Sequence, residues 1–519
     1  MLYPIGIQNF EKLRDGDYIY VDKTDKLYNL VNQGGYYFLS RPRRFGKSLL
    51  VSTLEAYLQG KKELFKGLAI DSLEKNWTEY PVLHIDLSGK AYQTREDLDV
   101  TLDQHLRKIE AGYGIQPKYV QPDARFKDAI VAAYEKTGRP VAILIDEYDK
   151  PIIDNLDNPD IQEYYRKTLQ GFYSVMKSMD RYIKFGFLTG VTKIGKLSVF
   201  SGLNNLNDIS MESGYSDICG ISDSDLHRYF GESTKELAAA NGMTEEQCYS
   251  KLAEMYDGYH FSRKSNGMYN PFSLLNTFKK MEFSEYWFET GTPTFLVKLL
   301  KRTDYDIRRI ADADVEIDID MISGVNDYIN DPIPVLYQSG YLTIRSFDEM
   351  FGIYRLGFPN MEVRKGFMKM LLACYVPVRE NEGNVLISKL YRAVTEGRPE
   401  DMMLLLESLF ARTNYQIQGD AEKDFQYAMY IIFELLGEYV QTEKQTSNGR
   451  IDILLQTKDY VYIMEIKTDS SADAALQQIE EKGYARPFAA DSRKLFRIGV
   501  SFSKENRRIE DWKILDSEA

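Results

Sequence analysis

The stretch from Ser40 to Ser48, with the sequence SRPRRFGKS, follows an apolar run and precedes a stretch with helical periodicity. Backbone N–H groups of such a loop and the positive end of the next helix can hold phosphate oxygens. Here Lys47 would neutralise the β- and γ-phosphate oxygens, and the hydroxyl of Ser48 would bind Mg²⁺. A standard Walker A motif has glycine five residues before Gly46, where this chain has Arg41. The loop therefore predicts a phosphate site with one unusual position.

The apolar run from Ile143 to Ile145 ends in two carboxylates, which are the second chemical feature. Asp146 would hold Mg²⁺ through water, and Glu147 is placed to polarise an attacking water molecule. For this segment alone, a buried strand whose terminal acids are solvated or cap the next helix is an equally good interpretation. Together with the loop at Lys47, the acids predict a nucleotide site with ATP and Mg²⁺ as cofactors.

A further apolar run, Phe187 and Leu188, ends in hydroxyl residues near Thr189 and Thr192. A residue that senses the γ-phosphate could lie there. For any single residue, an ordinary turn between strand and loop is the favoured interpretation.

Asp452, Glu465 and Lys467 have the types and spacing of a second site. Glu465 and Lys467 lie two positions apart, so in a strand both side chains project from one face. Asp452 and Glu465 would hold one or two Mg²⁺ ions through oxygen, and Lys467 would orient or help to deprotonate water attacking a phosphodiester. A cross-strand salt bridge on a solvated hairpin is the common alternative, and such a pattern also occurs by chance.

Composition limits the classes of protein to which this chain can belong. Its 519 residues are enough for three to four domains at roughly 150 residues each. The 65 Lys and Arg against 78 Asp and Glu give a net charge of −13, which disfavours non-specific coating of nucleic acid but leaves a local basic groove open. Three widely spaced cysteines disfavour a disulfide framework and structural zinc. Without a signal-type start or a membrane-length apolar run, we expect a cytoplasmic protein with no membrane partner.

The elements that must position these groups fall into four predicted segments. Residues 1–225 alternate continuous apolar runs with amphipathic stretches, which indicates an α/β fold with a parallel sheet and helices on both faces. Residues 226–290 are predicted to be a helical lid ending in a turn at Asn270 and Pro271, and residues 291–412 a winged-helix-like region with linker helices. Strands are expected at 36–39, 82–85, 141–145 and 185–188, with a further pair near 340–344 and 354–356.

The fourth segment, residues 413–519, is predicted to run helix, hairpin, helix, strand. The expected helices are 425–440 and 472–481, and the expected strands are 449–455, 460–467 and, as the last element, 496–502. The segment has 14 Lys and Arg against 19 Asp and Glu, which does not favour tight nucleic-acid binding. Basic groups near Arg493 and near Lys504 could line a groove, although solvated surface clusters are more common.

On these motifs the sequence resembles AAA-ATPase-like proteins of bacteria that are fused to a PD-(D/E)xK nuclease-superfamily domain. In that family the RPRRFGKS form replaces the glycine-led loop, so the resemblance implies that Arg41 is a family trait. The residues that carry the resemblance are Tyr20 to Thr24, Ser40 to Ser48, Leu144 to Asp149, Ser201 to Asn205, Tyr256 to Tyr259, Tyr269 to Phe272, Gly449 to Asp452, Ala475 to Ile479 and Tyr484.

The resemblance implies a P-loop NTPase domain at residues 1–225 and a PD-(D/E)xK nuclease-like domain at residues 413–519. Arg43 and Arg44 would add phosphate contacts, although they could equally face an acidic neighbour. Glu422 is a weaker candidate for an accessory acid. The predicted nucleotide-binding residues are thus Arg43, Arg44, Phe45, Gly46, Lys47, Ser48 and Asp146, and the predicted catalytic residues are Glu147, Asp452, Glu465, Lys467 and Gln478.

Two functional hypotheses remain at this point. The first is an ATP-binding, ATP-hydrolysing switch joined to a Mg²⁺-dependent nuclease domain that acts on DNA or RNA. The rival is an ATP-regulated scaffold whose nuclease-like domain binds a partner without cleaving it. A homo-oligomer is a further expectation, because AAA-like modules often work as rings in which a neighbour supplies an arginine at the γ-phosphate.

Overall fold

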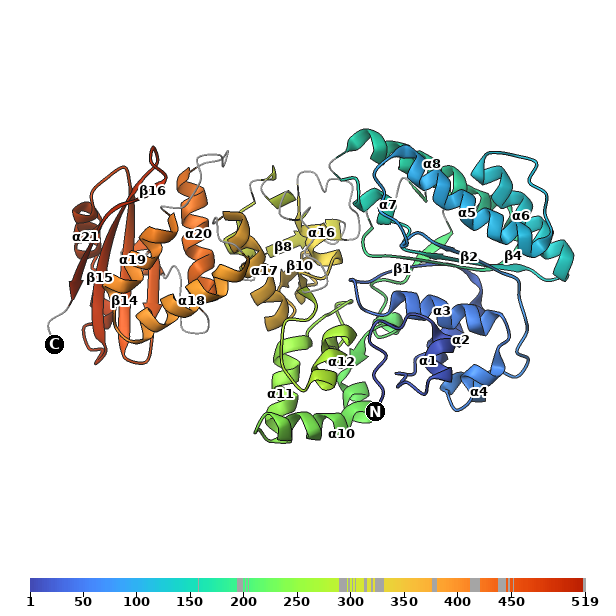
Figure 1. Cartoon of the computed structure of the whole chain (residues 1–519), viewed down its shortest axis with the longest axis horizontal. Helices are drawn as coiled ribbons and strands as arrows, with labels where there is room; N and C mark the ends of the chain where they lie inside the picture. Colours follow the sequence, from blue (N-terminus) through green and yellow to red (C-terminus); the bar gives the residue numbers. More distant parts are fainter. Residues whose placement is uncertain are drawn as a thin grey trace. The chain divides into compact units, whose positions relative to one another are not determined.

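The computed structural model describes residues 1–156, 158–193, 199–200, 202–203, 205–288, 296, 299–300, 302–303, 305–311, 315–318, 321–322, 331–375, 380–410, 421–436, 445–446, 449–450 and 452–516. The chain forms two compact units, Met1–Arg364 and Lys365–Ala519. The first contains a parallel sheet and a small antiparallel sheet with their helices, and the second contains a mixed sheet with its helices (Figure 1). The boundaries of the four predicted domains stay a prediction.

A five-stranded sheet forms the centre of the first unit, with the order β2-β3-β4-β1-β5. All neighbouring strands in it are parallel. The strands are β1 (Gly35–Ser40), β2 (Val82–Asp86), β3 (Val141–Asp146), β4 (Ile183–Gly190) and β5 (Leu206–Asp208). Every side chain of β3 is buried, as a strand covered on both faces requires, and this is why its sequence is continuously apolar. The four expected strands are confirmed, whereas β5 gives no apolar run because two of its three residues are polar.

Helices cover both faces of this sheet (Figure 1). One face carries α1 (Phe10–Asp15), α2 (Thr24–Gln33), α3 (Lys47–Leu58) and α4 (Ala69–Leu73), and the other carries α5 (Arg95–Tyr113), α6 (Pro122–Thr137) and α8 (Pro159–Ser178). Local sequence sets the helix ends. In α5, Thr94 and Asp97 form a capping box at the start, and Gly114, with a φ of 73°, follows the last residue. The predicted fold class of the N-terminal region is confirmed.

A group of three helices and a two-stranded ribbon follows. Its elements are β6 (Ile221–Ser222), α10 (Asp223–Ala240), α11 (Glu245–Tyr256), β7 (Met268–Tyr269) and α12 (Pro271–Lys280), and their apolar faces share one buried core. The expectation that Asn270 and Pro271 end this region is wrong. Oδ1 of Asn270 accepts hydrogen bonds from the N–H groups of Phe272 and Ser273 and so caps α12. Pro271 occupies the first turn, where its missing N–H has no intrahelical partner to lose.

A three-stranded antiparallel sheet lies towards the end of the first unit's sequence. Its elements are β8 (Val315–Asp318), β9 (Thr343–Asp348) and β10 (Ile353–Gly357), in the order β8-β10-β9, with the short helices α14 (Ile307–Ala311) and α16 (Ile333–Gln338) nearby in sequence. The expected strand pair is confirmed as β9 and β10, and β8 is additional. Gly258 allows this region to approach the helical group, because a Cβ there would lie 2.2 Å from the carbonyl oxygen of Pro359.

The second unit contains a four-stranded sheet with the order β13-β14-β15-β16, in which only β14 and β15 are parallel. Its elements are α18 (Glu380–Thr395), α19 (Pro399–Phe410), α20 (Ala421–Leu435), β13 (Ile453–Gln456), β14 (Tyr460–Thr468), α21 (Ala472–Glu481), β15 (Lys494–Ser503) and β16 (Arg508–Asp516), with α17 (Met361–Tyr375) spanning the division between the units and a ribbon of β11 (Gln445–Thr446) and β12 (Gly449–Arg450). Gly499 lets α21 lie close to the sheet, because a Cβ there would lie 2.2 Å from the carbonyl oxygen of Ala472.

Sequence and structure differ at three places in this unit. The helix expected at 425–440 is α20, Ala421–Leu435, and residues 437–440 lie outside the described part. The strand expected at 449–455 is divided between β12 and β13. The strand near 496–502 is not the last element, because β16 follows it with a mixture of charged and apolar residues that forms no apolar run. Within the described ranges, no helix combines the length and apolarity that crossing a bilayer requires.

Candidate functional site

The loop between β1 and α3 has its left-handed backbone at Arg44 and Gly46, with φ of 69° and 92°, and not at Arg41. The missing glycine at position 41 therefore causes no backbone strain. The Arg41 side chain is buried and donates hydrogen bonds to the carbonyl oxygens of Ser210 and Tyr215, at 2.8 and 2.9 Å. Burial lowers the pKa of Arg41. Arg41 thus holds the segment after β5 against the loop, in place of the glycine of a standard motif.

Lys47 lies at the start of α3 and is 5% exposed. Its Nζ donates hydrogen bonds to the carbonyl oxygens of Arg41 (2.9 Å) and Pro42 (3.1 Å), so the ammonium group lies inside the curve of the loop. Burial lowers the pKa of Lys47, and the negative charge of Glu147 acts against this shift. α3 has no side-chain cap and no acid in its first turn, so its backbone N–H groups suit an anion.

The remaining loop residues divide into two kinds. Phe45 is buried and makes edge-to-face contacts with Tyr259 and Phe261, with ring centroids 4.8 and 5.3 Å apart. Only its backbone is therefore suited to a phosphate. Ser48 is half-buried in the first turn of α3, and Arg43 is exposed.

The acids at the end of β3 lie beside β4. Asp146 is 3% exposed, and its Oδ1 accepts hydrogen bonds from the hydroxyl of Thr189 and from the N–H of Glu147. Glu147 has a φ of 53°, a left-handed conformation that costs a residue other than glycine about 1 kcal/mol or more and is common at functional sites. Burial raises the pKa of Glu147, and Lys47 acts against this shift. Such a carboxylate is suited to accept a proton.

Asp149 is a site residue that sequence reasoning did not single out. It is 1% exposed, lies just before α7 (Lys150–Ile153), and accepts hydrogen bonds from the N–H and hydroxyl of Thr192, at 2.6 and 2.9 Å. Burial raises the pKa of Asp149. In the sequence it is marked only as the third acid of the run Asp-Glu-Tyr-Asp. Its hydrogen bonds fix the loop that follows β4.

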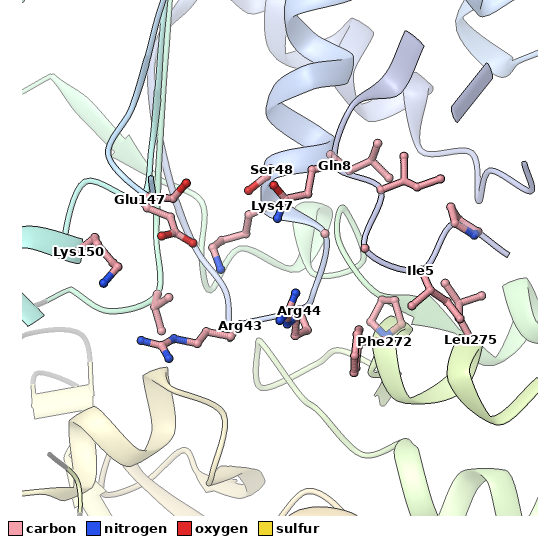
Figure 2. Close-up of a pocket in the computed structure, with 18 of the residues that line it drawn as sticks. Ile5, Gln8, Arg43, Arg44, Lys47, Ser48, Glu147, Lys150, Phe272 and Leu275 are labelled. Atoms are coloured by element: carbon pink, nitrogen blue, oxygen red, sulfur yellow. The ribbon is translucent and has the colours of Figure 1, made fainter. Parts of the chain in front are cut away.

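A pocket of about 400 Å³ brings most of these groups together. Figure 2 shows Lys47, Ser48 and Glu147 around it, with the arginines of the loop at its edge. Ile5, Phe272 and Leu275 line another side, and these come from the N-terminal segment and from α12. One part of the pocket is thus charged and suited to phosphates, and the other is apolar and suited to the nucleobase of a nucleotide. Asp146 is not in contact with the pocket but lies next to Glu147.

The second unit brings together four of the predicted catalytic residues. Oδ2 of Asp452 accepts a hydrogen bond from the N–H of Ile466, at 2.9 Å, which holds Asp452 next to β14. Glu465 and Lys467 lie on β14, with Oε1 and Nζ 3.5 Å apart. Gln478 of α21 bridges the two, because its amide nitrogen donates to Oε1 of Glu465 and its amide oxygen accepts from Nζ of Lys467. The side chain of Glu422 lies outside the described residues.

Glu465 is the buried member of this group, at 2% exposed. Its Oε2 has no hydrogen-bond partner among the described residues. Burial and the neighbouring charge of Asp452 raise the pKa of Glu465 to about 7. An unpartnered buried carboxylate oxygen next to a second carboxylate fits a hard divalent cation, which would supply the missing contact.

The basic residues near Arg493 that were considered for a groove are engaged by neighbouring acids. Arg493 pairs with Asp491 at 2.5 Å, and Lys494 pairs with Asp516 at 2.9 Å. Arg497 is bonded to Glu480. These pairs disfavour a preformed basic groove at this surface.

Histidine and cysteine do not build a metal centre in the described part of the chain, where no group of three or more His, Cys, Asp or Glu side chains has metal-binding geometry. The ring of His84 bonds to Glu55 at 2.9 Å, and that of His105 bonds to the carbonyl oxygen of Asp86 at 2.8 Å. Cys219 is a free, buried thiol, and burial raises its pKa to about 11.

Comparisons with known proteins agree with this division. Residues 4–200 match the protein family described as predicted AAA-ATPase, and residues 420–512 match the PD-(D/E)XK nuclease superfamily. The chain is 37% identical over 522 residues to an uncharacterized protein in the vnfD 5′ region of Azotobacter chroococcum mcd 1. This similarity covers 98% of the present chain and 97% of that relative.

Proposed function

Because this chain belongs to the family in which a predicted AAA-ATPase-like domain is joined to a PD-(D/E)XK nuclease-superfamily domain, we propose that it hydrolyses ATP and cleaves nucleic-acid phosphodiesters with Mg²⁺. The observation that carries the first activity is the pocket lined by both Lys47 and Glu147. The second activity rests on the group of Asp452, Glu465 and Lys467 at one end of β14.

In the first site, Lys47 would exchange its two carbonyl partners for β- and γ-phosphate oxygens. The backbone N–H groups at the start of α3 would donate further hydrogen bonds to the phosphates. The apolar side of the pocket would bind the nucleobase. Mg²⁺ would be held by Ser48 and, through water, by Asp146, whose Oδ2 makes no hydrogen bond in the described structure. The ion would supply electrostatic stabilisation of the phosphate charge.

Glu147 is the residue that would accept a proton from the attacking water. Its raised pKa and its place beside the pocket suit a general base. Thr189 would keep Asp146 oriented, since its hydroxyl donates to that carboxylate.

In the second site, Asp452 and Oε2 of Glu465 would hold Mg²⁺, which would polarise the phosphodiester. Lys467 would orient the attacking water, and Gln478 would keep Lys467 and Glu465 in register by bridging them.

Cleavage of labelled DNA and RNA, single- and double-stranded, tests this proposal directly. We expect Mg²⁺-dependent cleavage that Asp452→Ala and Lys467→Ala abolish without changing ATP affinity. Lys47→Ala should weaken ATP binding, and Glu147→Gln should stop hydrolysis while ATP remains bound. Unchanged ATP affinity in Lys47→Ala would remove the first assignment.

The alternative is a scaffold whose nuclease-like unit binds a partner without cleaving it. It is favoured by the acidic balance of residues 413–519 and by the pairing of Arg493, Lys494 and Arg497 with acids. ATP binding without cleavage of any of the four substrates, with Mg²⁺ or Mn²⁺, would favour this alternative.

A further inference from the structure

The two neighbouring arginines of the phosphate loop point to different sides of the pocket. Arg44 has left-handed backbone, with a φ of 69°, and this turn in the chain separates its side chain from that of Arg43. The guanidinium of Arg44 lies over the ring of Phe272 in α12, 5.0 Å from its centroid. Figure 2 shows Arg43 extending the opposite way, to the side where Glu147 and Lys150 lie.

The backbone of Arg43 is fixed by a residue far away in sequence. Its carbonyl oxygen accepts a hydrogen bond from Nε1 of Trp287, at 3.2 Å. The neighbouring Pro42 is held on its other side by Gly340, where a Cβ would lie 2.6 Å from Cβ of Pro42. These contacts fix the position of the Arg43 backbone. A ligand can therefore change the position of its side chain only.

Arg43 and Glu147 line the same pocket, on the side where Lys150 also lies. Among the residues that the structure describes, the guanidinium of Arg43 makes no hydrogen bond or ion pair. Lys150, on the same side, is instead paired with Asp154 at 2.5 Å. Of these two cations, Arg43 is the one whose charge is not already paired.

We propose that Arg43 contacts the γ-phosphate of bound ATP and stabilises the charge that develops during hydrolysis, so that each chain supplies its own arginine. This rests on the proposed ATP hydrolysis at the same site. In the step, the oxygen of water forms a bond to the γ-phosphorus while the bond from that phosphorus to the β,γ-bridging oxygen breaks. The electron pair of the broken bond stays on the β-phosphate of ADP. The proton of water passes to Glu147, and inorganic phosphate leaves.

Arginine suits this task because its planar guanidinium can bond to two phosphate oxygens at once. Arginines at this place in other phosphoryl-transfer enzymes raise kcat by roughly 10³ to 10⁵. In many such systems a second protein provides the arginine, and the reaction then depends on assembly. With Arg43 in its own loop, this chain would hydrolyse ATP without an arginine from a neighbour.

Kinetics of single variants test the role of Arg43. Arg43→Ala should lower kcat at least about 100-fold, while the Kd for ATP stays within a few-fold of wild type. Arg43→Lys should recover only part of kcat. Arg228→Ala is the control, because Arg228 is likewise an exposed arginine but does not line the pocket. An unchanged kcat in Arg43→Ala, or a loss confined to Kd, would overturn the proposal.

Mixing two inactive variants tests whether the arginine acts within one chain. Arg43→Ala retains Glu147, and Glu147→Gln retains Arg43. If the arginine came from a neighbour, the mixture would recover hydrolysis; we expect no activity above the sum of the separate variants, and a wild-type kcat that does not change with protein concentration. Recovery in the mixture would overturn the proposal. If wild type binds ATP but never hydrolyses it, the proposed ATPase activity itself fails, and this inference with it.

Discussion

The hydroxyl of Thr189, at the end of β4, donates a hydrogen bond to Oδ1 of Asp146 at the end of the neighbouring strand β3. Both side chains are buried, so this bond is shielded from water. The bond connects Asp146, the acid that would hold Mg²⁺, to β4. The loop that follows β4 is in turn bound by Asp149. The orientation of Asp146 therefore depends on β4 as well as on its own strand.

Replacing Thr189 by valine keeps the shape of the side chain and removes the donor. We expect ATP hydrolysis to fall about tenfold or more, because a buried carboxylate that loses a partner costs about 1 to 3 kcal/mol. Thr189→Ser keeps the hydroxyl and should remain near wild type. Equal activities of the two variants in a steady-state ATPase assay would show that this hydrogen bond does not matter for catalysis.

Replacing Arg41 by glycine would restore the residue of a standard Walker A motif, and we expect it to harm this protein. The carbonyl oxygens of Ser210 and Tyr215 would lose a charged donor, at a cost of at least about 2 kcal/mol. Hydrogen exchange followed by mass spectrometry should then be faster in residues 206–218 and unchanged in the second unit. Improved ATP binding with unchanged exchange would contradict the structural role given to Arg41.

Removal of divalent metal should affect the second unit through Asp452 and Glu465. A ligand that binds only the folded state stabilises it in proportion to the logarithm of ligand concentration. We therefore expect Mg²⁺ to raise the melting temperature of the transition that reports on Trp512, and EDTA to reverse this. Glu465→Gln conserves the volume of the side chain and should abolish the response. The same rise in the variant would exclude Glu465 as a ligand.

The pair of Glu55 on α3 and His84 on β2 should titrate as a unit. Burial acts to lower the pKa of His84, but its hydrogen bond and charge interaction with Glu55 outweigh burial, and the pKa of His84 lies above its ordinary value. Burial acts to raise the pKa of Glu55, but its hydrogen bond and charge interaction with His84, together with the charges of Lys61 and Lys108, outweigh burial and lower it. The stabilisation is therefore complete only between the unfolded pKa values, roughly pH 4.5 to 6.5. It is lost above this window as His84 deprotonates, and below it as Glu55 protonates.

Imidazole signals in NMR can check this directly, because the chain has only four histidines. His84 should titrate above pH 6.5, and Glu55→Gln should lower its midpoint. His105 serves as an internal comparison, since burial lowers the pKa of His105. A midpoint of His84 that does not respond to Glu55→Gln would exclude this pairing.

Much of the fold follows from hydrophobic pattern, and the departures have physical reasons. β3 is a continuous apolar run because it is buried on both faces, whereas β16 mixes charged and apolar residues because most of its side chains are exposed. Asn270 and Pro271 are common both in turns and at helix starts, so the sequence alone does not distinguish the two.

The candidate sites can be predicted from the sequence because their residues are close in sequence or belong to strands with a clear apolar pattern. Arg41 could not be understood in this way, since its partners Ser210 and Tyr215 are brought to it by tertiary packing. The different directions of Arg43 and Arg44 depend on one backbone angle at position 44. Asp149 has no distinct signal beyond a third acid in the run, because its role is to bind backbone N–H groups of a distant loop.

β16 has a consequence for how the protein behaves in a crowded solution. Among the described strands it is the outermost of its sheet, with no strand partner on its other edge, and such edge strands readily add a strand from another molecule. Arg508, Glu510, Asp511 and Lys513 are exposed along it, and bringing a second copy alongside would require these charges to be dehydrated or opposed. The charged residues that interrupt any apolar run in β16, and so make the strand hard to predict, thus also protect the sheet against edge-to-edge aggregation.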